Sequence, residues 1–115
     1  MFKTPIIIIS EKITKFLSWV VPVSGITIWP FIILSPNANN EITINHETIH
    51  IKQYEETFII GFYIIYIFEW IYNYIKTGDA KLAYYSIRFE KEAYQNHANM
   101  NYLKERKPMA WKHYV

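Results

Sequence analysis

The segment from Phe58 to Ile75 most constrains how this chain can fold, because it is almost uninterruptedly apolar. It is nearly long enough to cross a bilayer, yet it contains Glu69 and Asn73. An ionised glutamate at the centre of a membrane costs about 2.5–3.5 kcal/mol even on lenient scales. We therefore interpret the segment as a core helix buried between other elements, apolar nearly all round. A helix embedded in a membrane, or lying on one, stays open as the alternative.

Length and composition limit the classes of protein that need consideration. With 115 residues, the chain (1–115) is predicted to form a single domain with a small core. Its formal net charge of +2 is too small to indicate binding to nucleic acid. Because the chain has no cysteine, any metal must bind histidine and carboxylate.

The isoleucine run near the N-terminus is too short for a signal peptide. We expect a cytoplasmic protein, with association to a membrane left open.

The N-terminal third is expected to combine one helix with extended chain. Ser10 can cap a helix at residues 11–20, and Pro22 is expected to end it. The segment Gly25–Leu34 is rich in β-branched and aromatic residues, which favours β-structure. Pro30 in its middle has no N–H to donate, so an edge strand or two short strands are predicted.

The rest of the chain is expected to be helical. After a turn at residues 35–40, helices are predicted at 41–56, 58–76 and 80–104, and Gly78 is the C-cap of the second. The expected fold class is therefore mostly α, of the α+β type. It consists of three core helices with a short N-terminal edge strand or hairpin.

The stretch INHETIHIKQ, from Ile44 to Gln53, contains two histidines four residues apart. Four residues of a helix advance by about 400°, so His46 and His50 project from one face, as two ligands of a zinc ion do. Glu47 is offset by about 100°, so it can reach a water activated by the metal without binding the metal itself. This arrangement predicts a zinc site in which Glu47 is a general base.

A catalytic zinc ion of this kind usually has a third protein ligand. No histidine stands six residues after His50, so the metzincin pattern H-E-x-x-H-x-x-G-x-x-H does not apply. A glutamate from a later helix is the other solution, and the residues alone leave Glu69, Glu90 and Glu92 open. Glu69 follows His50 at the spacing of thermolysin-like enzymes, but its context IFEWIYNY does not resemble their N-E-x-x-S-D element.

The elements NHETIHIKQ and RFEKEAYQN, separated by an aromatic helix, resemble the gluzincin clan of zinc metallopeptidases. They are similar to the catalytic core of membrane peptidases related to HtpX and to the BlaR/MecR antibiotic sensors, and to the soluble minigluzincins. The resemblance covers about Gly25–Asn96. In these families the third ligand opens a short E-x-x-A-D or E-x-x-C-D element, which implies Glu90 here. Tyr94 replaces the aspartate, which removes the acceptor expected beside the ligands.

Other residues are candidates for supporting roles. Tyr94, His97 and Glu69 are predicted to lie beside the ligands or to steady a transition-state oxyanion, and Arg106 is a weaker oxyanion candidate. The edge segment is expected to bind the substrate backbone by strand addition. Its residues are Ile28, Trp29, Phe31, Ile32, Ile33 and Leu34.

Two functional hypotheses follow. In the first, the chain is a minimal zinc-dependent peptidase, active or latent, that hydrolyses a peptide or protein substrate. In the second, it is a non-catalytic zinc-binding module that docks on a protein partner or a membrane surface. The basic and aromatic tail KERKPMAWKHYV could fold over the metal in a latent enzyme or provide the docking segment. The oligomeric state is not predictable from these residues.

Overall fold

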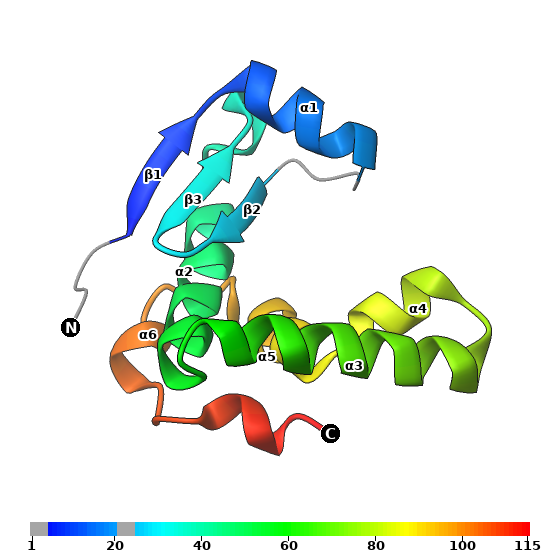
Figure 1. The fold of residues 1–115 in the computed structure, drawn as a ribbon. Helices are drawn as coiled ribbons and strands as arrows, with labels where there is room; N and C mark the ends of the chain where they lie inside the picture. The colour runs from blue at the N-terminus through cyan, green and yellow to red at the C-terminus, as the bar shows by residue number, and fades with distance from the viewer. Residues whose placement is uncertain (1–4, 21–24) are drawn as a thin grey trace.

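The computed structural model describes residues 5–20 and 25–115. A small sheet with one helix lies at one end, the other helices gather at the opposite end, and the long helix α2 joins them (Figure 1). The elements in chain order are β1 (Ile6–Ile9), α1 (Glu11–Val20), β2 (Gly25–Ile28), β3 (Phe31–Leu34), η1 (Pro36–Ala38), α2 (Glu41–Glu56), α3 (Ile60–Thr77), α4 (Ala80–Tyr85), α5 (Arg88–Asn96), α6 (Tyr102–Glu105) and η2 (Ala110–His113). The mostly helical α+β class is confirmed. The expected helix end at Pro22 lies outside the described residues.

The described residues form a three-stranded sheet in the order β1-β3-β2. β2 pairs antiparallel with β3, from Gly25 opposite Leu34 to Ile28 opposite Phe31. Pro30 lies in the turn between these strands, which confirms the prediction of two short strands. β3 also pairs in parallel with β1, so it is the central strand. The prediction that Phe31–Leu34 is a free edge is therefore wrong.

β1 was not expected as an element. Ile6 to Ile9 is a run of β-branched residues, which favours a strand, but four residues alone carry too weak a signal. The partner of β1 is β3, more than twenty residues later, with Ile6 opposite Phe31. A parallel pair needs a long crossover, and α1 is part of that crossover here. Only this long-range pairing turns the isoleucine run into a strand.

The helix α2 begins where the turn residues predict. Asn40 is its N-cap, and the side chain accepts a hydrogen bond from the Thr43 N–H at 2.9 Å. α2 ends at Glu56, and the chain turns by 110° into α3. In this turn Phe58 and Ile59 both have positive φ, at 57° and 67°. The sharp turn separates the two helices that the sequence predicts at 41–56 and 58–76.

The third predicted helix, at residues 80–104, is broken into α4, α5 and α6. Ile87 has an extended backbone, and its buried side chain packs in the core. Glu69 of α3 accepts a hydrogen bond from the Arg88 N–H at 2.9 Å, so it caps the first turn of α5. Because this acceptor comes from another helix, the local sequence could not show the break.

The prediction that α3 is buried on all sides is also wrong. Among its residues only Phe62 is buried, and it packs between Tyr54 and Phe89. The opposite side of α3 exposes isoleucine, phenylalanine and tyrosine side chains. Among the described residues no helix is long and apolar enough to cross a membrane alone, and α2 with α3 meets that criterion only as a bent pair.

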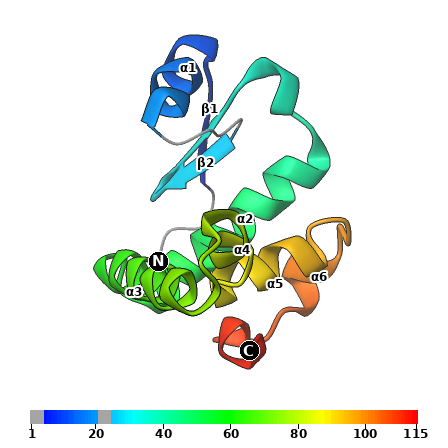
Figure 2. The same ribbon diagram turned by 90° about the vertical axis from the view of Figure 1, so that its right-hand side faces the viewer.

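The main core joins the helices to the C-terminal segment. It contains Tyr54, Phe62, Ile87, Phe89 and Trp111, and a smaller cluster under the sheet contains Ile32, Leu34 and Ile51. The tail thus supplies Trp111 to the core through η2, which packs against α5. Figure 2 shows η2 at the end of the molecule away from the sheet.

Candidate metal centre

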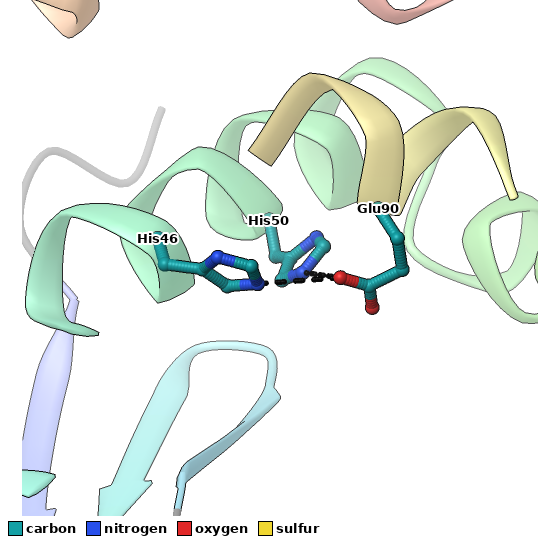
Figure 3. Close-up of side chains that lie close together, drawn as sticks. All are labelled: His46, His50 and Glu90. Atoms are coloured by element: carbon teal, nitrogen blue, oxygen red, sulfur yellow. Dashed lines mark hydrogen bonds and ion pairs between the residues drawn. The ribbon is translucent and has the colours of Figure 1, made fainter. Parts of the chain in front are cut away.

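His46, His50 and Glu90 come together as a buried group that can hold a metal ion, with one ligand atom from each lying within 4.8 Å of the others. The two histidines come from α2 and the glutamate from α5. Figure 3 shows the histidine rings and the carboxylate pointing toward one another between these helices. Their side chains are 8%, 6% and 5% exposed, so water contributes little to stabilising them. The structure thus brings Glu90, the glutamate implied by the resemblance, to both histidines.

The distances suit a tetrahedral metal. Glu90 Oε1 lies 3.2 Å from His46 Nε2 and 3.1 Å from His50 Nε2. Ligand atoms about 2.0–2.1 Å from a tetrahedral zinc ion are about 3.3 Å from one another. One class of catalytic zinc site has this donor set, two imidazole nitrogens and one carboxylate oxygen. The residues present therefore fit a zinc ion, although the donor set does not by itself identify the metal.

Gln53 determines which nitrogen of His50 faces the site. Its Nε2 donates to Phe89 O at 3.1 Å and to Glu92 Oε1 at 2.9 Å, so both donors of the amide are used. Its Oε1 must then be the atom that lies 2.7 Å from His50 Nδ1 and accepts a hydrogen bond from it. With the proton on Nδ1, the Nε2 lone pair of His50 is free to bind a metal.

His97 makes the corresponding contact with the other histidine. Its Nδ1 lies 3.0 Å from His46 Nδ1, and one of the two must donate. Burial, and then the charge of His46, lower the pKa of His97, which favours a neutral ring. With its proton on Nε2, such a ring accepts from His46 at Nδ1. His46 then carries its proton on Nδ1 and directs Nε2 toward Glu90. In this way His97 supplies the acceptor that Tyr94 does not.

Tyr66 holds the second oxygen of Glu90. Its hydroxyl donates to Glu90 Oε2 at 2.7 Å, which leaves Oε1 for the histidines. Burial, and then the Glu90 charge, raise the pKa of Tyr66, so this hydroxyl keeps its proton. Tyr66 was not predicted as a site residue from the sequence, because nothing in the order of the residues connects α3 to Glu90.

The charges of the three residues are strongly coupled without a metal. Burial alone raises the pKa of Glu90, but the neighbouring His50 and His46 hold it well below its ordinary value. Burial alone lowers the pKa of His50, but the Glu90 charge outweighs this and raises it to about 9. A divalent cation can take over the role of the imidazolium proton, because it also supplies positive charge beside Glu90.

Glu47 is buried next to the site on α2 and points toward the sheet. The Thr27 hydroxyl of β2 donates to Glu47 Oε1 at 2.8 Å. Tyr54, also on α2, donates to the Thr27 carbonyl at 2.8 Å and so ties β2 to the helix. Glu47 is outside the group of three ligands, as its offset on the helix predicts.

The alternative third ligands have other partners. Glu69 pairs with Arg88, with 2.6 Å between Oε2 and Nη2, in addition to capping α5. Glu92 is fully buried and accepts from Gln53, Tyr102 and Arg106. Arg106 itself bridges Glu92 and Glu56, so it is not positioned as an oxyanion partner.

Tyr94 lies beside His46, as predicted, whereas the segment predicted to bind substrate is not an edge strand over Phe31–Leu34. The Tyr94 ring lies edge-on to His46, with 4.5 Å between ring centroids, while its hydroxyl bonds to that of Tyr84. Trp29 lies in the β2–β3 turn and packs against both core clusters. Ile32, Ile33 and Leu34 are core residues of the central strand, so substrate addition along β3 is blocked by β1 and β2.

Comparisons with protein-family models, with curated proteins and with solved structures found no match to this chain.

Proposed function

We propose that this chain is a minimal zinc-dependent peptidase whose metal ligands are His46, His50 and Glu90. The observation that carries the proposal is the buried group of these three residues, each with its other polar atom held by Gln53, His97 or Tyr66. A solvated surface helix that contained this motif by chance would not need buried hydrogen bonds to orient its histidines. The resemblance to gluzincins supports the same assignment.

Each residue has a distinct role in the proposed reaction. A zinc ion held by the three ligands would act as a Lewis acid, polarising the carbonyl of the substrate and lowering the pKa of a water molecule toward about 7. Glu47 takes a proton from the attacking water and passes it to the leaving amine. Thr27 keeps one oxygen of Glu47 in place, so the other can accept the proton. A peptide or protein is the proposed substrate class.

Replacing Glu47 with glutamine tests the chemistry. The amide keeps the shape of the carboxylate and can still accept from Thr27, so Glu47→Gln should bind zinc like the wild type. It cannot act as the base, and loss of a general base typically costs about 10²–10⁴-fold in rate. Hydrolysis of casein and of quenched fluorescent peptides, at equal zinc occupancy, measures the effect. Glu41→Gln, on the exposed first turn of the same helix, is the matched control.

Equal rates for wild type and Glu47→Gln would contradict the proposed mechanism. The second candidate, a non-catalytic zinc-binding module, is favoured by the close contact of Glu47 with Thr27, since that contact would also stabilise a buried structural site. A wild type that binds zinc stoichiometrically and hydrolyses no peptide in either assay would select this candidate.

A further inference from the structure

The outer face of α3 is apolar although it points to solvent. Six large residues form its centre: Ile60, Ile64, Ile67, Phe68, Ile71 and Ile75. Their exposed fractions run from 44% at Ile71 to 79% at Ile75. Phe58, just before the helix, is 89% exposed. A contiguous apolar surface of this kind marks a binding surface, whereas single exposed apolar residues do not.

The order of residues around this face is regular. At about 100° per residue, the six isoleucine and phenylalanine side chains fall within an arc of about 100°. Tyr63 and Tyr74 border the arc on one side, and Tyr72 borders it on the other. All three tyrosines are exposed, at 41%, 44% and 66%. We call this set, six central residues and three bordering tyrosines, the outer face of α3.

Two polar side chains of α3, Glu69 and Asn73, point the other way, toward α5 and α4. Glu69 caps α5 and pairs with Arg88. Asn73 donates to the Ala83 carbonyl of α4 at 3.2 Å. α3 therefore directs its glutamate and its amide inward and most of its isoleucines outward, the reverse of a helix that faces water. Lys76, in the last turn, is exposed but lies outside the apolar arc.

A lipid surface fits this face better than a partner helix does. The 4-3-4 spacing of Ile60, Ile64, Ile67 and Ile71 would suit a helix pair, but such pairs use a narrow seam bordered by charged residues that set the register. Here the exposed arc, tyrosines included, covers about half the circumference, and no charged residue lies within it. Tyrosine places an apolar ring at lipid and a hydroxyl at water, which is what the borders of an inserted helix require.

We propose that α3 docks this protein on a lipid bilayer, lying along the surface with its six central residues in the acyl region and the bordering tyrosines at headgroup level. The 18 residues of α3 extend over about 27 Å, and its inner side is packed on α4 and α2, so it lies on the bilayer and does not cross it. This proposal is independent of the metal and of catalysis.

Vesicle binding tests the proposal. Full-length protein is mixed with unilamellar vesicles of phosphatidylcholine and phosphatidylglycerol, and the bound fraction is measured by co-sedimentation over a range of lipid concentrations. We expect the wild type to bind and the double variant Ile67→Glu/Ile71→Glu to bind at least tenfold more weakly, since each isoleucine removed from lipid costs about a factor of ten or more. Both side chains are exposed, so the fold should persist, as checked by circular dichroism.

The matched control carries the same two charges on exposed apolar residues elsewhere, Met100→Glu/Val115→Glu, and should bind like the wild type. Equal loss of binding in both double variants would show that net charge, and not the outer face of α3, governs binding, and would overturn the proposal. So would a wild type that does not bind the vesicles. A wild type that dimerises without lipid in sedimentation equilibrium, through contacts that Ile67→Glu/Ile71→Glu abolishes, would assign the face to a second copy instead.

Discussion

At the residue scale, the positions of the two histidine rings depend on neighbours that do not themselves touch the metal position. Gln53 is fully buried and uses both its donors on α5, so its oxygen has one remaining orientation, toward His50. Residues that orient metal ligands in this way typically contribute about 10–100-fold to metal affinity.

Replacing Gln53 with leucine should therefore weaken zinc binding by about 10–100-fold, because His50 loses the acceptor that keeps its proton on Nδ1. Affinity is measured by competition with a chromophoric chelator at fixed pH. Gln95→Leu, an exposed glutamine on α5, is the matched control and should bind zinc normally. Unchanged affinity in Gln53→Leu would mean that His50 is oriented without Gln53.

The residues that the sequence could and could not predict differ in one physical respect. His46, Glu47 and His50 were predictable because one turn of helix fixes their geometry. Glu90 required the resemblance, since nothing local distinguishes it from Glu69 or Glu92. Tyr66 and Thr27 reach the site only through tertiary packing, from α3 and β2, and no spacing in the sequence reveals that approach.

At the scale of elements, the helix boundaries with local signals were predicted and those with remote signals were not. Asn40 and Gly78 cap α2 and α3 from adjacent positions in the chain, and both boundaries follow from the sequence. The start of α5 depends on Glu69, nineteen residues earlier. That remote cap explains why the break between α4 and α5 was not predicted.

The variant Glu69→Ala should lower the free energy of unfolding by about 1–2 kcal/mol, because α5 loses its cap and Arg88 its partner. Urea denaturation of the zinc-free protein measures this change. Glu105→Ala, at an exposed position in α6, should have little effect. Zinc affinity should be nearly unchanged in Glu69→Ala, and a loss comparable to that of a ligand variant would make Glu69 part of the metal site.

At the scale of the whole molecule, the C-terminal segment stabilises the fold. Trp111 is 4% exposed. The centroid of its ring lies 4.8 Å from that of Phe89 and 5.0 Å from the guanidinium carbon of Arg88. Glu56, at the end of α2, accepts from the Met109 N–H at 2.8 Å. The sequence left open whether this tail covers the metal. The tail contacts the core, α5 and the end of α2, which argues against a removable cover.

Removing residues 107–115 should therefore destabilise the protein strongly and should not release activity. Loss of a buried tryptophan alone typically costs about 3–5 kcal/mol, a large part of the stability of a small domain. The melting temperature is measured by circular dichroism, and peptidase activity is assayed on the same samples. Removal of Val115 alone, which is 93% exposed, is the control. A truncated protein that melts like the full chain and gains activity would support the latent-enzyme interpretation.

The zinc content of purified protein tests the central claim most directly. Metal analysis after dialysis against zinc-containing and then metal-free buffer should give one zinc per chain for the wild type and for Glu69→Ala. It should give almost none for His46→Ala, His50→Ala or Glu90→Ala, since each change removes one of the three ligand atoms. A wild type without zinc, or one zinc per chain retained in any of these three ligand variants, would contradict the assignment of the site.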